Sequence, residues 1–514
     1  MIKKWVPTID REIVGSFPKS DCHSNVSDKA TSQTLSLAPI SNMFLSCIWF
    51  LELLLLSLLF NVNSAQTIVK SLPGYPGELP FKLETGYVSV GKNDTVQLFY
   101  YFIESERDAV RDPLVLWLTG GIGCSAFSGL VYEIGPLNFD AESYNGSLPS
   151  FILNPYSWTK IANIILLDLP VGTGFSYATT SQGYLSSDTK STNDAYMFLQ
   201  KWLLNHPKFI NNRLYIAGDS YGGKIAPMVV LEITKGNEAG LTPHMSIEGY
   251  LIGNPAMNVP KDENWRVPYA HRLALISDEY YERAKSSCDG EYMNPNPNNA
   301  ECQFALQLIK QCTSNICLSH ILEPICKFRA PKLDGLKWDL TYFEEDPNDI
   351  LLPSSDQENP KCRFTDYVLS YVWMNNPGVR EALQIRKGTK EKWKRCNGSL
   401  PISYDQDVTS VFDHHQVLST KGYQALVYSG DHDMMIPYIG TLQWIRDLNL
   451  TLEEDWRPWF LNGQIAGYTL KYQFQEDQCY LTFATVKGGG HTAPEYKPKE
   501  CFAMIDRWFS YYPL

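Results

Sequence analysis

The most constraining feature of the 514-residue chain is the segment Leu214–Gly223, which reads LYIAGDSYGG. A short apolar run typical of a buried strand ends in the pattern G-x-S-x-G around Ser220, and a helical pattern begins at Lys224. Small residues on both sides of a serine let a strand turn sharply into a helix and leave the hydroxyl exposed. In this context the motif predicts a nucleophilic serine at the end of a strand in an α/β sheet.

The other apolar runs are continuous rather than alternating, which is typical of strands buried on both faces. These runs occupy residues 113–118, 161–169, 214–217 and 246–252, and helical patterns cover 194–205 and 224–234. Alternating strands and helices predict a mostly parallel central sheet. A hairpin is expected at 86–103, and the pattern resumes with strands at 425–428 and 480–486 and helices at 439–448 and 500–509.

Residues 254–371 interrupt this pattern. They hold six of the ten cysteines that follow residue 65 and contain no sustained apolar strand. We therefore expect a disulfide-rich cap inserted into the sheet domain, over one end of the sheet. The predicted division is an N-terminal extension with signal peptide (1–65), a first core part (66–253), the cap (254–371) and a second core part (372–514).

Residues 44–60 form an apolar run with a single charge, Glu52, followed by the small residues 63–65. This run is short for a membrane span and typical of a signal peptide. Because it begins late, either translation starts at Met43, or the run is a non-standard leader or a signal anchor. We expect cleavage, no stable membrane span, and a secreted or vacuolar protein. Four glycosylation sequons downstream of this run agree with this route, at Asn93, Asn145, Asn397 and Asn449.

Acidic residues outnumber Lys plus Arg by 56 to 44, for a formal charge of −12. A chain this acidic lacks the basic surface that nucleic-acid binding requires. The glycine-rich segment 118–125 lacks the Lys of a phosphate-binding P-loop, and the cysteine spacing gives weak support for zinc. We therefore expect no metal and no cofactor. The short basic stretch 390–395 (KEKWKR) is interpreted as a solvated helix face.

A serine hydroxyl needs a general base, and the base needs an acid that fixes its tautomer. Asp431 and Asp433 follow the strand predicted at 425–428, and His491 follows the strand at 480–486 after three glycines. One aspartate would orient the imidazole and the other would tie the loop; the residues alone leave the choice open. For the oxyanion, the amide of Tyr221 and an amide of the glycine-rich loop 118–125 are the expected donors.

Together these segments resemble the serine carboxypeptidase-like family of the α/β-hydrolase fold, from about Thr67 to the C-terminus. The supporting segments include WLTGGIGCSAFSG, LDLPVGTGFSYA, GDSYGG, SGDHDMMIP and GGGHTAPEYKP. The resemblance implies a catalytic triad of Ser220, Asp433 and His491. It also implies that Gly121 and Tyr221 provide the oxyanion amides.

Two substitutions separate this chain from the family's peptidases, which typically have Asn and Glu where it has Thr119 and Asp219. In those peptidases the Asn and a pair of acids bind the free C-terminal carboxylate of the substrate. A shorter acid and a lost amide donor should weaken that clamp. With SGDHD and HTAPEY, these residues resemble the plant acyltransferase branch, which moves an acyl group from a 1-O-acyl-glucose ester to an alcohol or amine. The implied substrate-binding residues are Thr119, Gly120, Glu133 and Asp219.

A serine-type carboxypeptidase acting at acid pH is the alternative, because the triad and the acidic pair of Glu133 and Asp219 are retained. A non-catalytic secreted binding protein is suggested only by Ile122, which replaces the family's usual proline in the oxyanion loop. The expected partners are a small-molecule acyl donor and acceptor, or a peptide C-terminus.

The same resemblance implies three disulfides. They pair Cys124 with Cys396, Cys288 with Cys302, and Cys326 with Cys362. The first would anchor the oxyanion loop to a distant segment, and the other two would brace the cap.

Overall fold

The structure is a computed structural model, and it describes residues 67–325, 363–474 and 479–514. The predicted leader (1–65) and the predicted disulfide between Cys326 and Cys362 lie outside the described residues. No helix within the described ranges combines the length and apolarity needed to cross a bilayer.

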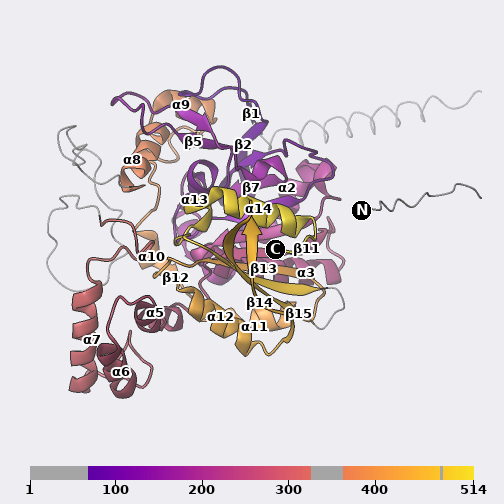
Figure 1. The fold of residues 1–514 in the computed structure, drawn as a ribbon. Coiled ribbons are helices and arrows are strands. Elements are labelled where there is room, and N and C mark those ends of the chain that lie inside the picture. The colour runs from indigo at the N-terminus through magenta and orange to yellow at the C-terminus, as the bar shows by residue number, and fades with distance from the viewer. Residues whose placement is uncertain (1–66, 326–362, 475–478) are drawn as a thin grey trace, which may run out of the picture. The chain divides into compact units, whose positions relative to one another are not determined.

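A large mixed sheet forms the centre of the fold (Figure 1). Its six central strands are parallel, as the continuous apolar runs predict. In spatial order they are β7 (Asn163–Leu167), β4 (Leu114–Leu118), β10 (Leu214–Asp219), β11 (Ile247–Gly253), β13 (Gln424–Gly430) and β16 (Tyr480–Val486).

Antiparallel strands extend this sheet at both sides. Next to β7 lie β3 (Val96–Ile103), β2 (Leu83–Val90), β1 (Thr67–Val69) and the short β8 (Tyr177–Ala178), and next to β16 lie β15 (Gln464–Gln473) and β14 (Thr451–Leu461). The β2–β3 hairpin was expected, whereas the β14–β15 hairpin was not. Its turn, Asn462–Gly463, has positive φ at both residues, which is the backbone that an Asn-Gly hairpin turn requires.

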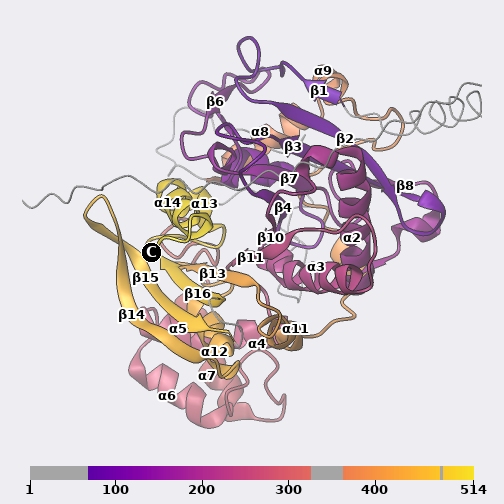
Figure 2. The same cartoon turned by 90° about the vertical axis from the view of Figure 1, so that its right-hand side faces the viewer.

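Helices cover both faces of the sheet (Figure 2). On one face, residues such as Ile216 and Ile252 pack against α2 (Asp188–Asn205), α3 (Ser220–Glu238), α11 (Phe412–Leu418) and α12 (Tyr438–Asp447). On the other face, Ala217 and Leu251 pack with α8 (Arg363–Met374) and α14 (Pro498–Phe509). Adjacent residues of one strand thus enter opposite cores, as the alternation of side chains in a strand demands. Burying a leucine or isoleucine side chain such as Leu251 or Ile216 contributes about 1.5–3 kcal/mol.

The described part of 254–371 adds helices and no strand to the sheet. It contains α4 (Val259–Asn264), α5 (Arg266–Arg272), α6 (Asp278–Ser287), α7 (Ala300–Thr313) and most of α8. A separate apolar cluster joins Tyr269 and Ile309 of this stretch to Met434 and Ile439, just after β13. By contrast, α8 runs across the predicted boundary at residue 371 and packs into the core of the sheet domain through Trp373.

The remaining strands and α-helices are short. They are β5 (Leu137–Phe139) paired with β6 (Phe151–Leu153), β9 (Ser186–Ser187) paired with β12 (Tyr404–Asp405), α9 (Pro377–Ala382), α10 (Leu400–Ser403) and α13 (Ala493–Tyr496). The parallel register aligns the carboxyl ends of the central strands at one edge, which is where α/β folds bind ligands. The loops that carry residues 119–125, 254, 431–433 and 488–491 all leave the sheet at that edge.

Candidate active site

Ser220 stands at a sharp turn between β10 and α3. The strand ends at Asp219, the helix begins at Ser220, and Ser220 itself has a φ of 50°, which is strained for a residue with a side chain. A Cβ on Gly222 would lie 2.0 Å from the carbonyl oxygen of Leu118, and one on Gly218 would lie 2.7 Å from the same atom. The turn therefore tolerates only glycine at both flanking positions, as the motif predicts.

The structure brings the three predicted triad residues together in one hydrogen-bonded chain. His491 Nε2 lies 2.8 Å from Ser220 Oγ, and His491 Nδ1 lies 2.8 Å from Asp433 Oδ2. The Asp433 side chain is fully buried and that of His491 is 11% exposed. A hydroxyl, an imidazole and a carboxylate in this order can activate an oxygen nucleophile.

The structure also distinguishes the roles of the two aspartates, which the sequence alone could not assign. Asp433 faces His491, and its carboxylate accepts the amide of Met435 at 2.7 Å and the Nδ2 group of Asn254 at 2.8 Å. Asp431 points elsewhere and accepts the amide of Gly488 at 2.7 Å, so it ties the two loops together. Sequence reasoning missed Asn254; its position directly after the buried strand β11 was the available signal.

The electrostatics around His491 favour its charged form. Burial alone would lower the pKa of His491, but the Asp433 carboxylate, and after it Asp219, outweigh burial and raise that pKa above its ordinary value. An imidazole that binds a proton more readily is a stronger base, which suits general-base catalysis.

The glycine-rich loop after β4 lies against the serine. Gly121 has a φ of 64°, in the left-handed region that favours glycine. The amide of Gly120 donates to Asp219 Oδ1 at 2.7 Å, and a Cβ on Gly120 would lie 2.5 Å from Ser220 Cβ. The loop therefore packs directly on the nucleophile, at the place where a second oxyanion donor is needed.

A distant segment holds the far end of this loop. The disulfide between Cys124 and Cys396 joins them, as predicted, and the amide of Ser125 donates to the carbonyl of Arg395 at 2.7 Å. The interpretation of 390–395 as a solvated helix face is wrong about the helix, although Glu391, Lys392 and Lys394 are exposed. The segment is not helical, Trp393 in it is fully buried, and Lys390 Nζ donates to the carbonyl of Gly172 at 2.7 Å.

Three polar residues carry buried groups at or near this loop: Thr119 belongs to the loop, Asp219 precedes the serine, and Glu133 interacts electrostatically with Asp219. Within the described residues, Thr119 Oγ1 and Glu133 Oε2 are buried and have no hydrogen-bond partner. Burial raises the pKa of Glu133 well above its usual range, and Asp219 and Glu495 add to the effect. Burial likewise raises the pKa of Asp219 to about 6, although His491 and the Gly120 amide oppose the shift. Buried polar atoms usually have a partner, so both atoms can still form a hydrogen bond with water or a bound molecule.

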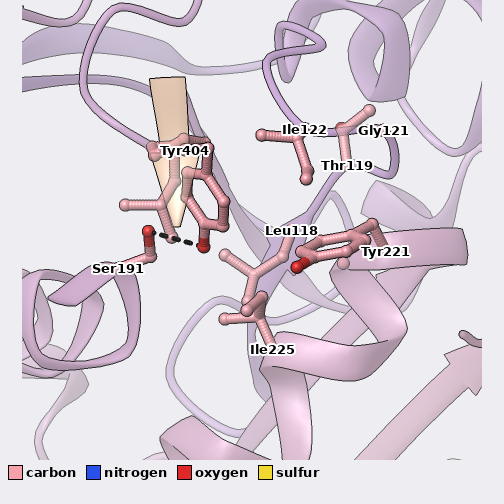
Figure 3. A pocket seen from close by; sticks show the side chains of 11 residues that line it. Leu118, Thr119, Gly121, Ile122, Ser191, Tyr221, Ile225 and Tyr404 are labelled. Atoms are coloured by element: carbon pink, nitrogen blue, oxygen red, sulfur yellow. Dashed lines mark hydrogen bonds between the residues drawn. The ribbon is translucent and has the colours of Figure 1, made fainter. Parts of the chain in front are cut away.

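A small apolar pocket opens beside the oxyanion loop (Figure 3). Thr119 and Ile122 lie on one side of it and Tyr404 lies opposite, while Leu118 and Ile225 form its floor. Tyr221, the residue after the nucleophile, completes the wall. The pocket therefore adjoins both proposed oxyanion donors.

A segment of the cysteine-rich insertion braces the histidine and aspartate loops. The carbonyl of Ser319 accepts the amide of His491 at 2.7 Å, and the carbonyl of Leu318 accepts the amide of Met434 at 2.9 Å. His320 stacks on Tyr496 with ring centres 4.7 Å apart, and its Nε2 lies 3.2 Å from the carbonyl of Gly488. No sequence pattern pointed to these contacts.

The remaining predicted sites lie away from the serine. Cys288 and Cys302 form the second predicted disulfide, between α6 and α7. Asn93, Asn145 and Asn449 are exposed, whereas Asn397 is half-buried and its Nδ2 donates to the carbonyl of Gly172 at 3.2 Å. In the ranges that the structure describes, no three His, Cys, Asp or Glu side chains are arranged to hold a metal ion.

Comparison with known proteins decides the family. The family model described as serine carboxypeptidase matches residues 73–511. The chain belongs to the serine carboxypeptidase family. This confirms the resemblance seen in the sequence, and it supports an enzyme of the serine carboxypeptidase-like hydrolase type.

Several curated relatives are proteins of the plant Arabidopsis thaliana. Serine carboxypeptidase-like 2 of Arabidopsis thaliana is 45% identical over 479 residues, covering 92% of this chain and 100% of the relative. Serine carboxypeptidase-like 17 of the same plant is 44% identical and covers 91% of this chain and 98% of the relative. Among solved structures, a prohormone-processing carboxypeptidase from Saccharomyces cerevisiae is similar, with a TM-score of 0.64, 18% identity, and coverage of 84% of this chain and 91% of that one. The last likeness confirms the α/β-hydrolase fold.

Proposed function

We propose that this member of the family is an acyltransferase that moves an acyl group from a 1-O-acyl-glucose ester to an alcohol or amine. The observation that carries the catalytic part is the hydrogen-bonded chain from Ser220 through His491 to Asp433. The observations that favour transfer are Thr119 and Asp219, in place of the amide and longer acid of the family's peptidases.

In the first half of the reaction, Ser220 Oγ attacks the ester carbonyl while His491 Nε2 takes the hydroxyl proton. The carbonyl oxygen becomes negative and is bound by the amides of Gly121 and Tyr221. The bond from the carbonyl carbon to glucose O1 then breaks, and His491 gives its proton to that oxygen. Glucose leaves, and the acyl group remains on Ser220.

In the second half, an acceptor hydroxyl or amine attacks the acyl-serine and His491 takes its proton. Collapse of the intermediate releases the new ester or amide, and His491 returns the proton to Ser220. Transfer exceeds hydrolysis when an acceptor, rather than water, occupies the position beside His491. The small apolar pocket next to Gly121 and Tyr221 suits an apolar portion of the acyl group.

Asp219 and Thr119 make a peptide the less favoured substrate in this proposal. Asp219 Oδ1 already accepts the Gly120 amide, and Thr119 offers a hydroxyl where a peptidase offers an amide donor. A carboxylate-binding clamp depends on short, well-aligned hydrogen bonds, so both changes weaken it.

A serine carboxypeptidase is the second candidate, and one observation favours it. Glu133 is buried beside Asp219, its Oε2 has no partner among the described residues, and its pKa is raised by burial. A carboxyl group that keeps its proton at acid pH can donate a hydrogen bond to the carboxylate of a peptide C-terminus.

Two assays on the same preparation separate these candidates. One supplies 1-O-acyl-glucoses with a panel of alcohol and amine acceptors, and the other supplies an N-blocked dipeptide at acid pH. The proposal predicts transferred ester or amide from the first and little amino acid from the second, with both activities lost in Ser220→Ala. Release of the C-terminal amino acid without any transfer product would instead assign the chain to the peptidases.

We also propose that the chain follows the secretory route to the vacuole or the cell exterior, with a glycan on each of the exposed sequons Asn93, Asn145 and Asn449. Glycosidase treatment of protein from plant tissue should lower its mass by three glycans. The half-buried Asn397 is the sequon for which we expect the least modification, because its amide nitrogen already donates to Gly172.

A further inference from the structure

A buried ion pair lies one helical turn beyond the nucleophile. Lys224 Nζ on α3 is 3.0 Å from Asp188 Oδ2, at the start of α2, and the two side chains are 2% and 0% exposed. Removing two charges from water is costly, so a buried ion pair is weak evidence for stability and a better sign of a fixed geometry. Lys224 follows Ser220 by four residues and therefore lies on the same face of α3.

The other carboxylate oxygen of Asp188, Oδ1, accepts hydrogen bonds from two tyrosine hydroxyl groups. Tyr221 OH donates to Asp188 Oδ1 at 2.5 Å, and Tyr404 OH lies 3.1 Å from the same oxygen. Tyr404 OH also lies 3.1 Å from Ser191 Oγ, the contact drawn in Figure 3. Burial, and after it the hydrogen bond to Asp188, keep the pKa of Tyr221 far above its ordinary value, so this phenol stays a donor.

The ring of Tyr221 is therefore held from several sides. Lys224 Nζ lies 4.9 Å from its centre, and the Tyr404 ring meets it edge-on at 6.2 Å. The backbone amide of Tyr221 directly follows the nucleophile, in the first turn of α3, where amide groups have no acceptor inside the helix. Because Ser220 has a strained φ of 50°, this turn depends on its surroundings to keep its shape.

We propose that Asp188 and Lys224 are positioning residues, which fix the oxyanion-binding amide of Tyr221 by anchoring its phenol ring. The inference rests on the proposed function, because it assumes that this amide binds the negative oxygen of the transition state. The anchor acts when charge develops and not when substrate binds. Loss of the anchor therefore lowers the maximal rate and leaves the concentration that gives half of the maximal rate nearly unchanged.

The test uses the full chain and a fluorophosphonate probe, which needs no knowledge of the natural substrate. In the labelling step Ser220 Oγ bonds to phosphorus, fluoride leaves, and His491 takes the hydroxyl proton. Losing one oxyanion donor outright costs about 10²–10³-fold in rate. Since Tyr221→Phe displaces the amide without removing it, we expect its maximal labelling rate to fall by about 10-fold. The probe concentration that gives half of the maximal rate should stay within about twofold of the wild-type value.

A matched control removes a tyrosine hydroxyl that forms a hydrogen bond with the other end of the same helix. Tyr423 OH lies 2.9 Å from Thr234 Oγ1 on α3, so Tyr423→Phe deletes a comparable hydrogen bond away from the serine. We expect this control to label Ser220 at the wild-type rate. Equal rates for Tyr221→Phe and Tyr423→Phe would overturn the inference.

A second variant tests whether Tyr221 acts through Asp188. Asp188→Ala/Lys224→Met removes both charges together and leaves neither buried alone. It should label as slowly as Tyr221→Phe, and adding Tyr221→Phe to it should cause no further loss, because residues that act through one contact are not additive. Additive losses would overturn the anchoring role. Absence of Ser220 labelling in the wild-type protein would instead overturn the proposed function itself, and the inference with it.

Discussion

The two halves of the candidate site are held by different parts of the molecule. The serine half is built from adjacent regular elements, β4, β10 and α3, with glycines that permit close packing at Gly120, Gly218 and Gly222. The histidine and aspartate half consists of loops after β13 and β16, held by Asn254 and by the insertion segment Leu318–His320.

This difference indicates how each half should respond to change. Disturbance of the serine half should act through the nucleophile turn and the oxyanion loop, either by steric contact or by loss of a group that anchors them. Disturbance of the other half should act through the orientation of the imidazole, including from residues that contact no reacting atom. The predictions below test that contrast, beginning with the largest effect.

Asp433→Asn should be the most severe change in the loop half. An amide can keep the contact with Met435 but cannot stabilise the imidazolium or enforce the required His491 tautomer. We expect kcat to fall by about 10⁴-fold. Asp431→Asn is the matched control, because Asp431 ties the same loop without touching His491. Comparable losses from both variants, in assays of acyl transfer or ester hydrolysis, would contradict the assignment.

Gly120→Ala should be the most severe small change in the serine half. The added Cβ would lie 2.5 Å from Ser220 Cβ, so the oxyanion loop has to move away from the nucleophile. We expect a loss in kcat of about 10²–10³-fold, comparable to removal of an oxyanion donor. Gly146→Ala is the control: its φ of 91° makes alanine strained in this exposed loop, but nothing lies within 4 Å of the new Cβ, so kcat should stay at the wild-type value.

The two disulfides within the described residues should differ in their effects on stability and on activity. Their sequence separations are 272 for Cys124–Cys396 and 14 for Cys288–Cys302. Replacing both cysteines by alanine should lower the free energy of unfolding by about 5 kcal/mol for the first pair and about 3 kcal/mol for the second. Only the first should also reduce kcat, by about 10-fold, because it anchors the oxyanion loop. Denaturant unfolding and kinetics on both double variants check this; equal kcat values would contradict it.

His320→Ala should show that the insertion supports catalysis from a distance. The imidazole stacks on Tyr496 and contacts the Gly488 carbonyl, next to the His491 loop. We expect kcat to fall by about 10-fold through small misplacement of His491. Leu322→Ala, at a side chain 71% exposed, is the control within the same segment and should leave kcat unchanged.

Asp219→Asn should give the smallest effect, a shift in pH dependence. Asp219 is one of the groups that raise the pKa of His491, so its neutralisation lowers that pKa. Neutral imidazole then persists to lower pH, and the acidic limb of kcat/KM moves to lower pH. The new side chain still offers an oxygen to the Gly120 amide. A limb that stays in place or moves upward in the pH–rate profile would contradict the electrostatic account.

The same contrast explains what the sequence could predict. The serine turn is a local pattern, so G-x-S-x-G between an apolar run and a helical pattern was sufficient to place Ser220. The continuous apolar runs gave the parallel strands, because burial on both faces leaves a strong compositional signal. The choice of Asp433 needed family resemblance in the sequence, and the structure now places that residue against His491.

What the sequence did not predict depends on long-range packing. The strand β14 exposes most of its side chains and lacks a continuous apolar run, although Asn462–Gly463 was an available turn signal. The stretch 390–395 reads as solvated because of its charges, yet it packs beside the oxyanion loop through Arg395 and buried Trp393. No periodicity reveals which distant carbonyl will accept the amide of His491.

The most direct test of the central claim is mass spectrometry of the peptide that contains Ser220. The protein is mixed with 1-O-acyl-glucoses carrying aromatic and aliphatic acyl groups, without acceptor, and quenched in acid. We predict that Ser220 gains the mass of the acyl group with at least one donor, and that an alcohol or amine acceptor then removes it as an ester or amide. Transfer product formed without an acyl group on Ser220, or in the Ser220→Ala variant, would contradict the account.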